Sequence, residues 1–122
     1  MNLIIRPLKI EDLQESKEIY ELTQKEYLGK KWDKIKEKKL KQMGVSNEED
    51  FRVYCETGFS FAAEKEGHVV GFIFAYETLP FEKNIYIQNY VVHPDFQKQG
   101  IGSELLKAVI SRAKSEHKNQ VC

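Results

Sequence analysis

The chain has few of the residues that hold a very small or secreted protein together. It contains only two cysteines, Cys55 and Cys122, and three histidines, so neither a disulfide framework nor a cluster of zinc ligands is expected. Cys55 falls in a predicted helix, and we interpret it as a small core residue rather than a nucleophile. No apolar run approaches the roughly 18 residues of a membrane span, and no signal-peptide pattern opens the sequence. These absences predict a cytoplasmic protein with no metal and no membrane partner.

The chain also lacks an excess of charge of either sign. Nineteen basic residues balance nineteen acidic ones, so the overall charge does not predict a nucleic-acid partner. The distribution is less even, because residues 30–41 hold seven lysines against Asp33 and Glu37, whereas residues 11–26 are acidic. Such blocks are typical of two solvated helix faces, and a docking surface is the alternative interpretation.

With 122 residues, the chain has room for one domain, and no linker or internal repeat is visible. Helical spacing and strand-like alternation of apolar residues mark its elements. In chain order, the pattern predicts a strand at 3–6 that is stopped by Pro7, then helices at 12–27 and within 28–43. A third helix is predicted after a capping box at Ser46, with Gly58 as its terminator. Hairpin strands at 59–64 and 69–76 follow, then a strand at 84–92 and a last helix after 102, whose core face includes Leu105, Leu106 and Val109.

The most informative segment is residues 91–102, in which an apolar strand is followed by a proline turn, two glycines and a helix. Gly100 and Gly102 lack a Cβ atom, and the amides at a helix N-terminus attract anions, so this order predicts a phosphate site. A Walker loop is disfavoured because Ser103 stands where lysine is required. A dinucleotide loop is disfavoured because Leu105 replaces its third glycine. A tight turn without a ligand is the alternative.

Gln97-x-x-Gly100-x-Gly102, with the strand before it and the leucine-containing helix after it, resembles the acyl-CoA loop of the GNAT family of N-acetyltransferases. The resemblance implies an α/β fold, the acyl-CoA N-acyltransferase fold, in which helices flank a mixed, mostly antiparallel sheet. Residues 1–122 would form a single N-acetyltransferase domain covering the N-terminal three quarters of that fold. Residues 118–122 look like the start of the family's fifth strand, and the usual C-terminal strands are missing.

Acetyl-CoA is the co-substrate that the resemblance implies. Its pantetheine arm would pair with the end of the strand at 84–92, and loop amides would hold its pyrophosphate. By position, the residues expected to bind it are Tyr90, Val91, Val92, Gln97, Lys98, Gln99, Gly100, Ile101, Gly102 and Ser103.

The reaction implied is direct attack of a primary amine on the thioester, and its catalytic residues are not identified by the sequence. Many family members carry a glutamate as base where this chain has Gln88, and the tyrosine that protonates the thiolate would lie beyond residue 122. Glu77 or His93 could act through water. The resemblance also places Tyr27, Trp32, Glu77 and Phe81 beside the acceptor, which would be a small molecule or a protein terminus.

Two other hypotheses remain beside N-acetyltransfer. Gln88 and the absent tyrosine suggest a catalytically weak CoA-binding or regulatory module, and a ligand-free structural domain is the third. The short C-terminal end has three competing explanations, namely a piece of a longer enzyme, a homodimer in which another chain covers the exposed strand edge, and a degenerate domain.

Overall fold

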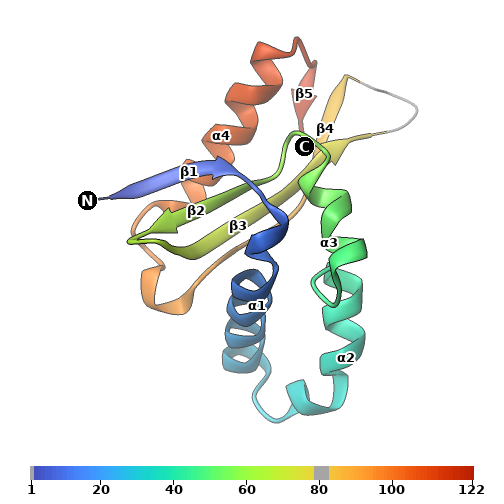
Figure 1. Ribbon diagram of the computed structural model, residues 1–122, viewed down its shortest axis with the longest axis vertical. Coiled ribbons are helices and arrows are strands. Elements are labelled where there is room, and N and C mark those ends of the chain that lie inside the picture. Colours follow the sequence, from blue (N-terminus) through green and yellow to red (C-terminus); the bar gives the residue numbers. More distant parts are fainter. Residues whose placement is uncertain (1, 79–82) are drawn as a thin grey trace.

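The computed structural model describes residues 2–78 and 83–122 (Figure 1). Its elements are, in chain order, β1 (Leu3–Pro7), the 3-10 helix η1 (Ile10–Asp12), α1 (Leu13–Leu28), α2 (Lys31–Met43), α3 (Glu48–Cys55), β2 (Phe61–Lys65), β3 (His68–Glu77), β4 (Asn84–Val92), the 3-10 helix η2 (Pro94–Phe96), α4 (Ile101–Ser115) and β5 (Gln120–Val121).

The strands form one sheet in the order β1-β2-β3-β4-β5. The first four strands are antiparallel to their neighbours, whereas β5 runs parallel to β4 because α4 carries the chain across between them. The turn between β2 and β3 has two residues with positive φ, Glu66 at 53° and Gly67 at 82°, as a tight hairpin requires. The predicted mixed, mostly antiparallel sheet is confirmed.

Helices cover both faces of this sheet. Alternate residues of β3 point to opposite sides, so Phe72 and Phe74 pack with α1, α2 and α3, whereas Ile73 and Ala75 pack with α4. Both faces of β3 are therefore buried, which explains its nearly continuous apolar sequence. Figure 1 shows α1 and α2 side by side and extending beyond the sheet.

The predicted third helix is present, but its cap was placed one residue too early. Asn47, not Ser46, is the N-cap, and its side-chain oxygen accepts a hydrogen bond from the backbone N–H of Asp50 at 2.9 Å. The helix ends at Cys55, before the Gly58 that was predicted to terminate it. Asparagine and serine are similarly good caps, so the local pattern could not choose between adjacent positions.

The strand predicted from residue 59 begins at Phe61. Ser60, which is buried, uses its hydroxyl to donate to the Ala75 carbonyl and to accept from the Ala75 amide, both at 3.0 Å. The Ser60 side chain therefore satisfies the backbone groups of Ala75 that a longer β2 would have paired, so the pairing of β2 with β3 starts only at Phe61.

The expected start of a fifth strand is confirmed at the C-terminal end. β5 pairs with Asn84 and Ile85, and the Cys122 carbonyl accepts a hydrogen bond from the Ile87 amide at 3.0 Å. Within the described part of the chain, no strand pairs with the outer edge of β4 beyond Ile87. The sheet thus opens at the end of β4 that precedes the glycine loop.

Candidate functional site

A cavity of about 490 Å³ lies where β4 ends and α4 begins. Strand β4, the loop between η2 and α4, the first turns of α4 and the middle of α1 form its walls. Its lining residues are Thr23, Gln24, Asn89, Tyr90, Val91, Val92, Phe96, Gln97, Lys98, Gly100, Ile101, Gly102, Ser103 and Leu106. We call this the loop cavity.

Nine of the ten residues predicted to bind the acyl donor line the loop cavity. Gln99 does not, because its side-chain oxygen faces the Lys65 ammonium at 3.4 Å on the other side of the loop. Thr23 and Gln24 were missed because the position of α1 over β4 is a tertiary feature without a local signal. Leu106 was predicted to face the core but is 38% exposed, because α4 turns that side of the helix toward the cavity.

The loop backbone presents unpaired amides to the cavity. Gly100 is the N-cap of α4 with φ of 83°, and no side chain within residues 2–78 and 83–122 caps the helix. The first hydrogen bond at this helix end runs from the Glu104 amide to the Gly100 carbonyl at 3.0 Å. The amides of Ile101, Gly102 and Ser103 therefore have no partner inside the helix and lie at its positive end. This arrangement can bind a phosphate.

Glycine is favoured at the two loop positions, 100 and 102, for different structural reasons. A Cβ atom on Gly100 would meet no protein atom within 4 Å, so a side chain there would extend into open space from a backbone that favours glycine. A Cβ atom on Gly102 would lie 3.3 Å from the Tyr90 ring, so glycine allows α4 to start close to β4. Lys98 also has a positive φ, 65°, which makes this a tightly constrained loop.

Two outward-facing backbone groups at the end of β4 are held by side chains rather than by a strand. The Tyr90 amide donates to the Asn89 side-chain oxygen at 2.8 Å, and the Val92 carbonyl accepts from the Gln97 side chain at 3.1 Å. The pairing of β4 with β3 shifts between Phe74 and Ala75, which is where this part of β4 begins. The edge can thus offer one donor and one acceptor to an extended ligand.

A second cavity, of about 540 Å³, lies among α2, α3, β3 and β4, and we call it the helix cavity. It is lined by Lys41, Gln42, Gly44, Asp50, Val53, Tyr54, Thr57, Tyr76 and Gln88. Gln88, which the resemblance places at the base position, directly precedes Asn89 of the loop cavity. The two cavities therefore meet at adjacent residues of β4.

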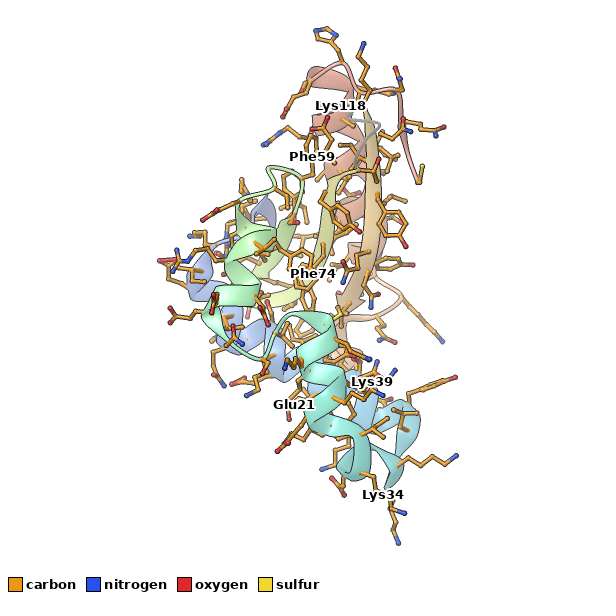
Figure 2. All side chains as sticks on the ribbon, turned by 90° about the vertical axis from the view of Figure 1, so that its right-hand side faces the viewer. Glu21, Lys34, Lys39, Phe59, Phe74 and Lys118 are labelled. Carbon is orange, nitrogen blue, oxygen red and sulfur yellow. The ribbon has the colours of Figure 1, made fainter. Side chains whose placement is uncertain are left out.

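Tyr54 supports the floor of the helix cavity. The Tyr54 ring stacks on the ring of Phe74, which is labelled in Figure 2; the two ring centroids are 4.1 Å apart and the ring planes are inclined by 7°. Burial raises the pKa of Tyr54, and a hydrogen bond with the Gln88 side chain partly opposes that rise. Tyr54 is consequently a neutral hydroxyl group near pH 7, able to donate or accept a hydrogen bond beside Gln88.

The two alternative bases already have partners. The Glu77 carboxylate forms an ion pair with Lys118 at 2.9 Å, which links the end of β3 to the segment before β5. The Nδ1 atom of His93 accepts a hydrogen bond from the Asp95 amide at 3.0 Å and thereby caps η2. Neither residue lines the loop cavity or the helix cavity.

The residues predicted to border the acceptor are not brought together. Trp32 is buried in the core with its ring edge on Tyr20, at a centroid distance of 6.1 Å. Tyr27 is 85% exposed at the end of α1. Phe81 lies outside the described residues. Helical periodicity could not distinguish a core aromatic residue from one that projects beyond the sheet.

Cys55, predicted to be a structural residue, is half-buried and packs against the core. Burial, reinforced by the negative charge of Asp12, raises its pKa to about 11, so the reactive thiolate is scarce near pH 7. Across residues 2–78 and 83–122 no group of histidine, cysteine and acidic side chains could hold a metal ion. In the same part of the chain, no helix is long and apolar enough to cross a membrane.

Comparison with known proteins decides the family. The acetyltransferase (GNAT) family matches residues 16–121, which is most of the chain and includes both cavities. The chain belongs to the GNAT family. Family membership makes it an acyltransferase, and the predicted acyl-CoA N-acyltransferase fold is confirmed. The comparison with curated proteins finds no match to the sequence.

Solved structures show how far this GNAT fold extends. The PaiA N-acetyltransferase of Thermoplasma acidophilum, solved with coenzyme A, has a TM-score of 0.78 at 17% identity, over 97% of this chain and 76% of that one. A GNAT acetyltransferase of Brucella melitensis, solved with acetyl-CoA, has a TM-score of 0.72 at 18% identity, over 98% and 73%. The Escherichia coli ribosomal-protein-S18-alanine N-acetyltransferase reaches 0.66 at 19% identity, over 98% and 64%.

Proposed function

We propose that this GNAT acyltransferase binds acetyl-CoA in the loop cavity and transfers the acetyl group to a primary amine. The observation that carries the proposal is the set of unpartnered amides of Ile101, Gly102 and Ser103 at the start of α4, facing a cavity beside an open strand edge. These amides suit a pyrophosphate. Relatives of the same fold were solved with coenzyme A or acetyl-CoA.

The pantetheine arm would follow the free edge of β4. The arm contains amide groups, and Tyr90 and Val92 offer a backbone N–H and a backbone carbonyl that now bond the Asn89 and Gln97 side chains. Both side chains belong to exposed residues, and turning away would cost Asn89 only its weak hydrogen bond to the Met43 sulfur at 3.5 Å. The thioester would then lie near Gln88, where the two cavities meet.

The acceptor amine would enter from the helix cavity. Gln88 cannot serve as a base, but its side-chain oxygen can accept a hydrogen bond from the amine and orient the lone pair toward the thioester carbonyl. The Tyr54 hydroxyl, hydrogen-bonded to Gln88, fixes the orientation of that amide. The proton is lost to water, since Glu77 and His93 have other partners and lie outside both cavities.

Calorimetric titration with acetyl-CoA tests the donor site, and the chain offers a matched control. Gly100 and Gly67 have φ values of 83° and 82°, and a Cβ atom on either meets nothing within 4 Å. Gly100→Leu and Gly67→Leu therefore impose similar backbone strain, but only the first places a side chain in the loop cavity. We expect Gly100→Leu to weaken acetyl-CoA binding at least about a hundredfold and Gly67→Leu to bind normally. Equal affinities in the two variants would contradict the proposal.

A CoA-binding module with weak or no catalysis is the second candidate. Gln88 at the base position and the engagement of both Glu77 and His93 favour it. This candidate predicts acetyl-CoA binding without release of free thiol across a panel of amines. Amine-dependent thiol release above the hydrolysis background, lost in Gly100→Leu, would exclude it.

A further inference from the structure

Four lysines of α2 form one exposed stripe, Lys31, Lys34, Lys38 and Lys41, which we call the lysine stripe. Their spacings of three, four and three residues place them within about 80° of one another around the helix, at about 100° per residue. The opposite side of α2 carries the buried Trp32, Leu40 and Met43. The stripe therefore points away from the core.

The charges of the lysine stripe are not used within the described part of the chain. Lys36, on another side of α2, forms an ion pair with Glu21 at 3.2 Å, whereas residues 2–78 and 83–122 provide no ion pair for any lysine of the stripe. Like charges three or four residues apart destabilise a helix by a few tenths of a kcal/mol per pair. The repulsion within the stripe thus costs stability, and no ion pair within the described residues offsets it.

The stripe leads to the helix cavity. Lys41, its last member, lines that cavity together with Tyr54 and Gln88. Figure 2 shows Lys34 pointing outward near the far end of α2, so the positive charges extend from the cavity mouth along the exposed helix. Ten residues of helix span about 15 Å, which is the length of about five residues of extended polypeptide.

We propose that the lysine stripe docks an acidic segment of a polypeptide acceptor, whose free amine enters the helix cavity. The inference rests on the proposed acetyltransfer, because it assigns the helix cavity to the acceptor. A polypeptide fits better than nucleic acid, since the chain has no net charge and Asp33 and Glu37 interrupt the positive surface of α2. Acidic side chains along an extended peptide can meet lysines at this spacing one by one.

The first test measures peptide binding by fluorescence anisotropy in the presence of CoA. The probes are two peptides of about ten residues with a free amino terminus and a C-terminal fluorophore, one rich in glutamate and the other with glutamine at the same positions. We expect the glutamate peptide to bind about tenfold more tightly at low salt and to lose this advantage as salt rises.

Charge-reversed variants locate the effect. Lys34→Glu combined with Lys38→Glu should abolish the preference for the glutamate peptide. Lys107→Glu combined with Lys114→Glu makes the same change of net charge on exposed positions of α4, on the other face of the sheet, and should retain it. Circular dichroism of all variants checks that they fold. An equal loss of preference in both pairs, or no preference in the wild type, would overturn the proposal.

Thiol release measured with the same peptides separates this inference from the proposed function. Faster acetylation of the glutamate peptide, reduced about tenfold only in the α2 variant, supports both. Charge-dependent binding without any acetyl transfer would remove the acceptor role and with it the proposed function, and leave only a docking surface. Acetylation that is equal for both peptides would support the proposed function and overturn the inference. Tighter binding of a single-stranded RNA of similar length than of the glutamate peptide at about 0.15 M salt would also overturn it.

Discussion

At the scale of single residues, the expected position of Gln88 where many family members carry a glutamate base predicts a particular pH dependence. Gln88 has no titratable group, and neither Glu77 nor His93 lines the loop cavity or the helix cavity. The fraction of neutral amine in solution should then limit the reaction. We expect kcat/KM to rise with pH up to the acceptor's own pKa, which is about 8 for a peptide terminus and about 10 for a lysine-like amine.

The measurement compares two acceptors that differ only in the position of the amine. Profiles that level off at two different pH values, each near the pKa of its acceptor, would support reaction without a protein base. A common inflection between pH 6 and 8 for both acceptors would contradict it and reveal a titrating group of the enzyme. Glu77→Gln and His93→Ala then identify that group.

Cys55 gives a residue-scale prediction for stability. Burial raises its pKa to about 11 from the ordinary value of 9.0, so the folded state binds the thiol proton more tightly than the unfolded state does. The resulting stabilisation is fully present below pH 9 and is lost as the pH rises through 11. We expect the free energy of unfolding of the wild type to fall relative to that of Cys55→Ala over this interval. Parallel curves for the two proteins would show that the thiol remains protonated in both states.

At the scale of elements, the N-cap of α3 gives a prediction, because the sequence pattern placed this cap one residue too early. The Asn47 side chain satisfies the Asp50 amide, whereas Ser46 has no cap hydrogen bond to this helix. We expect Asn47→Ala to lower the free energy of unfolding by about 1 kcal/mol and Ser46→Ala to change it by less than about 0.5 kcal/mol. Urea unfolding of both variants gives the comparison, and a larger loss from Ser46→Ala would contradict the assigned cap.

Local sequence patterns predicted the elements well because their determinants are local. β4 has the predicted bounds, and α1 is shifted by a single residue from its predicted bounds. The spacing of apolar residues and the residues that end each element determine both. Most of the lining of the loop cavity was predictable for the same reason, because residues 90–103 are contiguous and the loop amides need no distant partner. The anion-binding geometry of a glycine loop between a strand and a helix is determined by the local sequence.

The helix cavity, which we propose for the acceptor, could not be predicted from local patterns because its residues are distant in sequence. The helix cavity joins Gly44, Tyr54, Tyr76 and Gln88 from four parts of the chain. A Cβ atom on Gly44 would lie 2.6 Å from the Tyr54 ring, so this glycine makes room for Tyr54, a relation that no spacing rule contains. Likewise, the ion pair of Glu77 with Lys118 removes a candidate base through a contact made across the sheet.

At the scale of the whole molecule, three ionic groups join the N-terminal strand to the fold. Arg6 on β1 bonds both oxygens of the buried Asp12 in η1, at 2.8 and 2.9 Å, and also Glu64 on β2 at 2.9 Å. The two carboxylates hold the pKa of Arg6 above its ordinary value, against the opposing effect of burial. This network anchors β1 and the start of α1, the helix that contributes Thr23 and Gln24 to the loop cavity.

The free edge of β4 determines whether the molecule associates with itself. An unpaired edge invites pairing with a second chain, but here Asn89 and Gln97 already bond the outward Tyr90 amide and Val92 carbonyl. We therefore expect the wild type to remain monomeric at about 0.1 mM in sedimentation equilibrium. Asn89→Ala combined with Gln97→Ala exposes both groups and should raise the dimer fraction, and acetyl-CoA should lower it again by occupying the edge. A wild type that already dimerises at this concentration would show that the two side chains do not protect the edge, and a double variant that stays monomeric would show that the edge is too short to pair.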